Sequence, residues 1–263
     1  MITLRLLYRR ALLLILLLFA VLTPPAFAEQ VHVSGAVLNP GDYQWQEGAR
    51  LRDAAVAGQV SASAWPLGAA LLRQRAIEPQ QRLKAGVLFE LQTNNIHALA
   101  ENNLELQQLI KRLDASVREM PVTGRVVAEL NPFQLLLQSK NDLLQPGDRL
   151  VYPTRPNRIR VLGAVAADCQ LSFDAGLKLK DYLHQCPAHP AADRSFVYLI
   201  QPNGETQKIG IAHWNQQQAA VAVGAIIYRP ISAAVLSPET NELNEDMAKL
   251  LATQYQLGGI YSE

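Results

Sequence analysis

Residues 31–37 (VHVSGAV) and 159–165 (IRVLGAV) are the strongest indication of the fold class, because they begin two segments that follow one pattern. In each stretch apolar residues alternate with other residues around a Gly-Ala-Val centre, which is typical of a half-buried strand. A turn follows; in the first copy it is Pro40-Gly41, where proline presets one backbone angle and glycine accepts the next. The pattern predicts two related strand–turn–strand openings in one chain.

Each opening continues through a glycine into a segment with helical spacing. The apolar positions of these segments are Leu51, Ala54 and Ala55 in the first copy, and Leu179, Tyr182 and Leu183 in the second. Both copies close with a turn that feeds a strand, at residues 144–153 and 221–230, and Pro153 and Pro156 mark a linker between them. The order predicts an α+β fold of two small units, each with a helix packed across a sheet.

Two amphipathic stripes interrupt the first unit, after a strand expected within residues 68–73. The stripes are Leu83, Val87 and Leu91, and then Leu99, Leu106, Ile110, Leu113 and Val117. Asn94-Asn95 is the expected break between two helices, and Pro121 ends the second. We expect a helical hairpin at about 76–120. Either its stripes cover only each other, or the hairpin also docks on the second unit and fixes the angle between the units.

The C-terminal segment, residues 237–257, predicts another amphipathic helix. Ser237 and Pro238 are suited to the N-cap and the first turn. Its apolar stripe consists of Leu243, Met247, Leu250, Leu251 and Tyr255. We expect this helix to pack on its own domain; the alternative is a helix that detaches to bind a partner or a membrane.

The N-terminus predicts a secretory signal peptide over residues 1–28. Arg5, Arg9 and Arg10 precede a short apolar run and an Ala-x-Ala exit. An uncleaved anchor is the alternative, but the run is short and two prolines follow it. Cleavage leaves 21 Lys and Arg against 23 Asp and Glu, a net charge of −2. This balance gives no electrostatic reason to bind nucleic acid or an anionic membrane, and no membrane span remains after cleavage.

Export gives the two cysteines of the chain an interpretation. In an oxidising compartment, Cys169 and Cys186 are expected to form a structural disulfide within one domain. The alternatives are two buried free thiols, or a zinc site that adds His184 and His189, whose spacing is irregular. No nucleophile elbow, phosphate-binding loop or dinucleotide fingerprint occurs in the sequence. We therefore expect no catalytic, metal or cofactor site.

Further motifs connect this pattern with known proteins. The V-x-V-x-G-x-V strand, the P-G-x-[YF] turn and the Leu-x-Asp helix start resemble the SLBB form of the β-grasp, which is familiar from outer-membrane polysaccharide export proteins. Three more motifs accompany them: Trp65-Pro66-x-Gly68-Ala69, Thr123-Gly124-Arg125 and Ala212-x-Trp214-Asn215. Their order is similar to that of the GfcC-like capsule-biosynthesis family of Gram-negative periplasmic proteins. The Cys pair and the Asp168-Cys169 turn depart from that pattern.

The resemblance implies two tandem β-grasp domains, at 29–156 with the inserted hairpin and at 157–236, followed by the C-terminal helix. It implies a periplasmic protein that is not an enzyme. Such a protein would assist assembly or export of a capsular or other exopolysaccharide by binding or scaffolding. Its partners would be the polysaccharide or outer-membrane export components. The alternatives are a periplasmic polysaccharide-modifying enzyme and a small-ligand carrier of the SLBB type.

Three residues are candidates for a pocket or for the seam between the units. Arg125 follows Gly124 where the hairpin returns to the sheet, so its five donors need partners. It either binds backbone carbonyls at the seam or lines a pocket for an anionic sugar or a partner carboxylate. Trp65 and Trp214 either stack on sugar rings or pack between the units.

Overall fold

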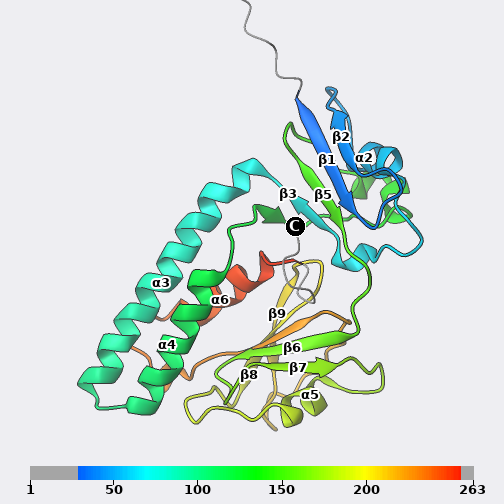
Figure 1. The fold of residues 1–263 in the computed structure, drawn as a ribbon. Coiled ribbons are helices and arrows are strands. Elements are labelled where there is room, and N and C mark those ends of the chain that lie inside the picture. Colours follow the sequence, from blue (N-terminus) through cyan, green and yellow to red (C-terminus); the bar gives the residue numbers. More distant parts are fainter. Residues whose placement is uncertain (1–28, 256–263) are drawn as a thin grey trace, which may run out of the picture.

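The structure, a computed structural model, describes residues 29–255, so the predicted signal peptide lies outside the described residues. The described chain is a mixed α+β protein with two five-stranded sheets and five α-helices (Figure 1). The first sheet contains β1 (Gln30–Gly35), β2 (Gly41–Gln44), β3 (Ala70–Leu72), β4 (Arg125–Val126) and β5 (Arg149–Tyr152). The second contains β6 (Arg158–Gly163), β7 (Cys169–Ser172), β8 (Phe196–Ile200), β9 (Thr206–Gly210) and β10 (Ile226–Arg229). The helices are α2 (Leu51–Gly58), α3 (Ile77–Ala100), α4 (Leu104–Glu119), α5 (Leu179–Gln185) and α6 (Leu243–Ala252).

The two sheets have the same topology. Their strand orders are β2-β1-β5-β3-β4 and β7-β6-β10-β8-β9, which correspond strand for strand. In each sheet the opening strand pairs in parallel with the closing strand, and every other neighbour is antiparallel. The repeat predicted from the two openings therefore extends through both sheets.

The predicted strand–turn–strand–helix openings are confirmed, and their registers match. Val31 pairs with Tyr43 in the first sheet, and Ile159 pairs with Leu171 at the corresponding position of the second. Each following helix begins in the same way, because the Asp53 and Asp181 carboxylates accept a backbone N–H from the N-cap residue, at 2.8 Å in both helices. Such a contact satisfies an amide that the helix itself leaves without a partner.

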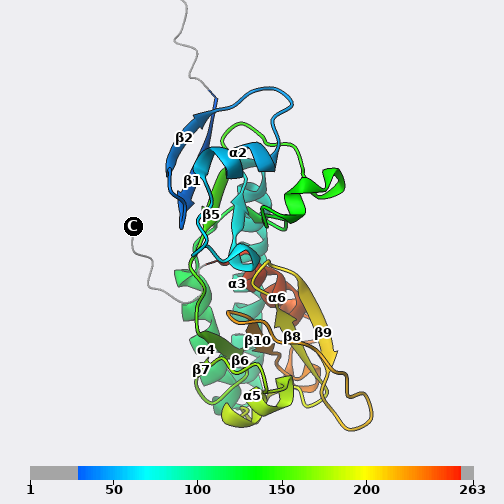
Figure 2. The ribbon, with the colours of Figure 1, turned by 90° about the vertical axis from the view of Figure 1, so that its right-hand side faces the viewer.

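The two sheets differ in how their faces are covered. Helix α2 covers one face of the first sheet, and α5 covers one face of the second. The other face of the second sheet packs against α3, α4 and α6, which lie side by side along it (Figures 1 and 2). The shared core includes Val87, Leu91, Ile110, Leu113, Tyr228, Met247 and Leu250. The hairpin thus docks on the second unit, although it is inserted in the sequence of the first.

The break in the hairpin does not lie at Asn94-Asn95, so that prediction is wrong. Helix α3 runs through both residues to Ala100, and the turn uses Asn102, whose φ is +53°. Asn94 is fully buried; its amide donates to Glu90 O at 2.8 Å and to Thr240 Oγ1 at 2.7 Å, and accepts from Ser237 N at 2.8 Å. A buried asparagine with these partners holds the helix to another segment instead of ending it. Leu99, expected in the apolar stripe, is 52% exposed.

The C-terminal helix is shorter than predicted. It begins at Leu243, six residues after the expected Ser237 cap, and ends at Ala252; residues 256 and 257 lie outside the described part. Ser237 instead begins a turn, because its N–H binds Asn94 and its carbonyl accepts from Thr240. The predicted stripe of α6 is buried from Leu243 to Leu251, against the chain's own core. None of the helices within residues 29–255 combines the length and the apolar character that a membrane crossing requires.

Candidate functional site

The seam between the two sheets is built around Arg125, the first residue of β4. Its side chain is only 6% exposed. The guanidinium donates to four backbone carbonyls: Ala69 (3.3 Å), Ala252 (3.4 Å), Gln254 (2.7 Å) and Pro202. One of these carbonyls precedes β3 of the first sheet, one follows β8 of the second, and two lie at the C-terminal end of α6. One side chain therefore joins three parts of the molecule.

The two residues before Arg125 set its position. Thr123 Oγ1 donates to Thr253 O at 2.7 Å and accepts from Arg125 N at 3.0 Å. Gly124 has φ +73°, and a Cβ atom there would lie 2.7 Å from the Arg73 carbonyl oxygen. Gln80, at the start of the hairpin, donates to Arg125 O at 2.7 Å and accepts from Gly124 N at 2.8 Å. The Thr-Gly-Arg motif is therefore fixed by contacts along its whole length.

The electrostatics of Arg125 are unusual for a cation, because carbonyl dipoles take the place of a carboxylate. None of the ion pairs found within residues 29–255 includes Arg125. Burial lowers its pKa to about 10, so the group stays protonated near neutral pH. The C-terminal end of α6 supplies the negative end of a helix dipole, which favours a cation there.

The hydrogen bonds of Arg125 limit what it can bind. Nη1 and Nη2 each donate to two carbonyls, and Nε has no hydrogen-bond partner among the described residues. Bidentate binding of a carboxylate needs two parallel N–H donors, so Arg125 would have to release carbonyls first. A cavity of about 320 Å³ adjoins it, lined by Val127, Gly204, Thr206, Lys249 and Thr253 among others. The geometry favours the seam over the anion pocket; a functional role of Arg125 stays a prediction.

Trp65 lies at the linker between the two sheets. A Cβ atom added to Gly68 would lie 2.3 Å from its ring, and one added to Gly224 would lie 2.9 Å from it. Pro153 and Pro156 border the same glycines. The indole therefore packs where the two units meet, and the two glycines are the residues that admit it.

Trp214 occupies a different place and is 75% exposed. Its ring stands edge to face with Phe196, at 6.3 Å between centroids, and Lys208 Nζ lies 4.7 Å from the Phe196 centroid. Asn215 fixes the turn that carries it, because its side chain accepts from Ala212 N and donates to Ser195 O. Among the described contacts, Trp214 lies neither in the cavity beside Arg125 nor in the packing around Trp65.

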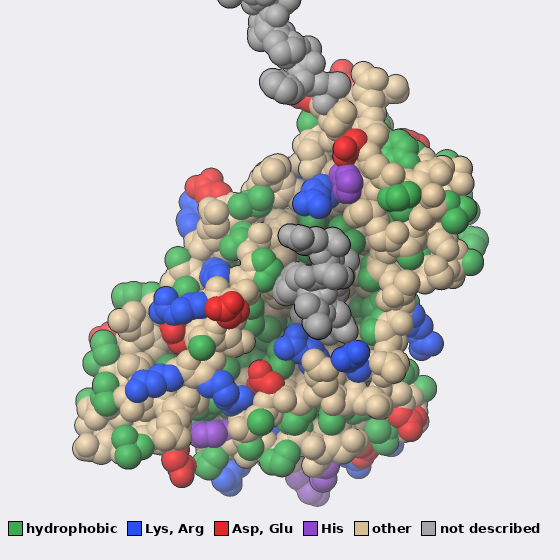
Figure 3. All heavy atoms as spheres, in the orientation of Figure 1, with side chains coloured by type: hydrophobic (Ala, Val, Ile, Leu, Met, Phe, Trp, Pro, Cys, Tyr) green, Lys and Arg blue, Asp and Glu red, His purple; other side chains and the backbone are tan. Residues whose placement is uncertain are grey.

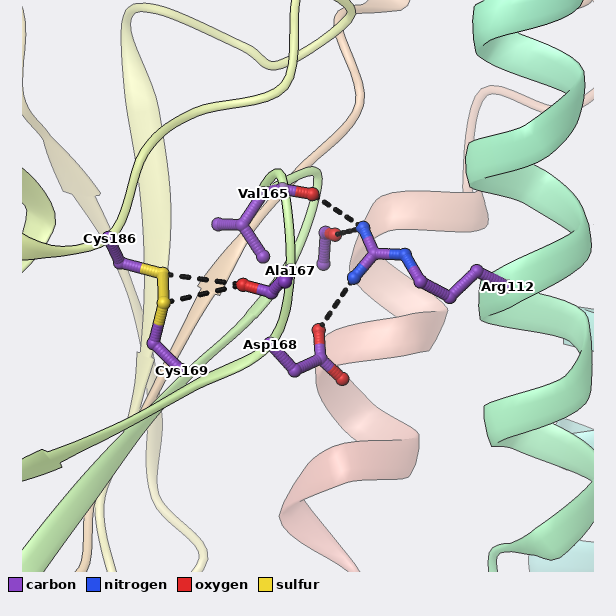
Figure 4. Close-up of a disulfide and its surroundings, with 7 residues drawn as sticks. Arg112, Val165, Ala167, Asp168, Cys169 and Cys186 are labelled. Carbon is purple, nitrogen blue, oxygen red and sulfur yellow. Dashed lines mark hydrogen bonds and ion pairs between the residues drawn. A yellow bond between two sulfur atoms is a disulfide. The ribbon is translucent and has the colours of Figure 1, made fainter.

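The predicted disulfide between Cys169 and Cys186 is present, with 6.1 Å between the Cα atoms. It lies beside the turn that receives the helical hairpin (Figure 4). From α4, Arg112 donates to Val165 O at 2.5 Å and to Gly163 O at 3.1 Å, and pairs with Asp168 at 3.0 Å. The Asp168-Cys169 turn is therefore a polar docking point of the hairpin on the second unit, beside the shared apolar core. Both thiols are consumed in the disulfide, so neither is a thiolate ligand for the alternative zinc site.

Sequence reasoning missed several residues that hold the units together. Arg112 and Gln80 lie on the polar faces of their helices, and Asn94 looked like a helix break. Helical periodicity assigns such polar positions to solvent, so no local signal distinguishes them from exposed residues. Trp45 was also missed; it lines a cavity of about 450 Å³ in the first unit.

No cluster suited to holding a metal ion occurs among the described histidine, cysteine and acidic residues. Acidic and basic side chains are interspersed over the face shown in Figure 3, and neither sign forms an extended patch there. The described residues form packed units with cavities at the surface.

Two comparisons bear on the family. Residues 167–255 match the family model described as capsule biosynthesis GfcC C-terminal. The uncharacterized protein YjbG of Escherichia coli (strain K12) is 26% identical over 191 residues, which cover 72% of this chain and 76% of that relative. The matched region includes the disulfide, the second sheet from β7 onward and α6. Over these regions the chain is similar to GfcC-type capsule-biosynthesis proteins, and the family-model match lies in its C-terminal part.

Proposed function

We propose that this protein is a non-enzymatic periplasmic component that assists assembly or export of a capsular or other exopolysaccharide. In this proposal its sheets are two tandem β-grasp units, and they act by binding or scaffolding. The observation that carries the proposal is the rigid connection of the two units. Arg125 ties both units to α6 through four carbonyls, and Arg112 ties the hairpin to the disulfide turn.

The burial of the apolar face of α6 supports a scaffolding role more than a role in which this helix detaches. The apolar face of α6 is almost fully buried, with Leu243 at 0% and Leu250 at 1% exposure. Detaching α6 would expose this face and break the Arg125 contacts, at a cost of about 1.5–3 kcal/mol for each fully buried side chain. We therefore propose that the surfaces available to a partner are the outer faces of the units.

The periplasmic location is supported by two features. The disulfide fits an oxidising compartment, and the sequence predicts a signal peptide over residues 1–28. Mass spectrometry of the protein recovered from the periplasmic fraction tests both. The expected mass corresponds to a chain that begins at residue 29 and lacks two thiol hydrogens.

A deletion strain and the purified protein test the function. We expect deletion to reduce surface display of the polysaccharide, and the wild-type chain to restore it. Incubation of purified protein with oligosaccharides from that polysaccharide should leave them unchanged by mass and chromatography. Defined cleavage or transfer products would instead support the enzyme alternative, and normal display in the deletion strain would contradict the proposal.

A further inference from the structure

The two units contain matching loops between the second strand and the helix. The loops align without a gap, from Trp45 and Phe173 through Gly48 and Gly176 to the capping residues Asp53 and Asp181. Trp45 N donates to Glu29 O at 2.7 Å, and Phe173 N donates to Asn157 O at 2.8 Å, so the backbones also correspond. Each loop lines a cavity, of about 450 Å³ in the first unit and about 550 Å³ in the second.

The residues that build the loop are shared, whereas the residues that line the cavity differ. Gly48 and Gly176 correspond, and the two capping carboxylates have the same 2.8 Å contact. In the alignment of the two loops, Trp45 corresponds to Phe173 and Glu47 corresponds to Ala175. The loop fold therefore requires neither tryptophan nor glutamate at these positions.

The aromatic rings of the first cavity are fixed, and their polar atoms are already satisfied. Trp45 Nε1 donates to Leu144 O at 3.2 Å. The Tyr43 hydroxyl lies 2.5 Å from Asn39 O and 3.0 Å from Ala57 O. Both side chains are partly buried, so what they offer to the cavity is apolar ring surface held in one orientation.

The rim of this cavity adds free polar groups. Gln46 and Glu47 are exposed, and neither side chain makes a hydrogen bond within residues 29–255. An amide can donate hydrogen bonds to hydroxyl groups and accept them, whereas a carboxylate accepts them. The carboxylates of Glu47 and Asp53 repel an anion, since like charges disfavour each other at short range. The loop lies at the outer end of the first sheet, away from the seam (Figure 2).

We propose that the Tyr43–Trp45–Glu47 cavity is a binding site for an uncharged pyranose unit of a glycan. The sugar ring stacks on the fixed aromatic surface, and its hydroxyls bind Gln46 and Glu47. The volume lies within the range of small-ligand sites, about 300–1,000 Å³. This inference rests on the proposed function, because it names the class of sugar that the protein binds.

The test uses the full mature chain labelled with 5-fluorotryptophan, whose ¹⁹F spectrum reports Trp45, Trp65 and Trp214 separately. The probes are oligosaccharides from the strain's own exopolysaccharide, divided by anion exchange into uncharged and acidic pools, with cellohexaose as a defined neutral probe. We expect the uncharged pool to shift the Trp45 resonance saturably, while the Trp65 resonance stays in place. A Trp45 resonance that no neutral probe moves, or that the acidic pool moves equally well, would overturn the inference.

Substitutions in the first loop, with a matched control in the second, locate the binding energy. By calorimetry, Trp45→Leu is expected to weaken binding of the uncharged pool about 2- to 10-fold, the range for loss of one aromatic contact. Glu47→Ala, which introduces the residue that the second unit has, is expected to weaken it less and to leave the melting temperature unchanged. The matched control Phe173→Leu should not affect affinity, and an equal loss in that control would also overturn the site.

The two proposals fail in different ways. Normal capsule display in the deletion strain contradicts the proposed function, whatever the fluorine spectrum shows. Lost display together with a silent Trp45 resonance contradicts only the sugar site.

Discussion

The two sheets share one topology, but their second faces differ. The second sheet is covered on one face by α5 and on the other by α3, α4 and α6. The first sheet has α2 on one face, and within residues 29–255 its other face carries a small apolar cluster of Ala70, Leu72 and Val151 against Tyr255. Strand β1 adds polar groups to this second face, where His32 pairs with Asp42 at 2.7 Å. Within the described residues, the same topology is thus covered by helices on both faces in the second unit, whereas in the first unit α2 covers one face.

The hairpin explains this difference. Its sequence interrupts the first unit, yet its apolar stripes are buried against the second. The first unit therefore supplies the cover for its neighbour. Contacts between units are consequently part of the second unit's core, and the two sheets should respond differently to substitution.

The largest difference is expected for Leu250→Ala. Leu250 is 1% exposed in the core that α6 shares with the hairpin, and truncating a buried leucine costs about 2–5 kcal/mol. Urea unfolding should show this loss. Amide exchange should accelerate in β8 and β10 more than in β1 and β5. The control is Leu99→Ala, at a hairpin leucine that is 52% exposed, and equal acceleration in both sheets would contradict the asymmetry.

The double variant Cys169→Ala/Cys186→Ala should have the next largest effect. A crosslink over 17 residues restricts the unfolded chain by about 3 kcal/mol in the entropic model. Denaturant unfolding of the variant, or of reduced wild type, measures the loss. Because Arg112 docks on the same turn, the hairpin should lose protection together with the second sheet. Unchanged protection of α4 would show that Arg112 does not depend on the disulfide.

Arg125→Ala should lower stability by a smaller amount. A hydrogen bond from a charged donor contributes about 1.5–3 kcal/mol, but the variant also removes the desolvation cost of a buried cation, which offsets part of the loss of several bonds. The melting temperature should fall, and Arg125→Lys should recover only part of it, because an ammonium lacks the planar fork. Arg75→Ala, at an exposed arginine, is the control. Loss of capsule display by a variant with a normal melting temperature would instead identify Arg125 as functional.

The smallest effect concerns pH. Burial lowers the pKa of His189 below its ordinary value of 6.5, and nearby Arg112 acts in the same direction against Glu105. The unfolded chain then binds more protons than the folded chain, so stability decreases as the pH falls through about 6.5. Thermal unfolding at pH 7.5 and at pH 5 should show this decrease, and His189→Asn should reduce it. A slope of the opposite sign would contradict the assignment.

Much of the secondary structure was predictable because its signals are local. Alternation around Val31 and Ile159, the Pro40-Gly41 turn and the stripe from Val87 to Val117 report on neighbours a few residues apart. The helix boundaries at Asn94 and Ser237 were not predictable in this way. The backbone N–H of Ser237 donates a hydrogen bond to the side chain of Asn94. The two residues are too far apart in the sequence for a periodic pattern to indicate this contact.

Hydrophobic periodicity and turn chemistry were enough to predict the repeated units and the helical insertion, and the predicted signal peptide led to the prediction of the disulfide. They could not specify which sheet the insertion covers, that four carbonyls surround Arg125, or that Trp45 and Tyr43 line one cavity. A stripe of apolar residues predicts that this face of the helix is buried, but the surface that buries it depends on the shape of the packed chain. That shape brings together residues as distant in sequence as Asn94 and Ser237, and so it settles which surfaces stay exposed.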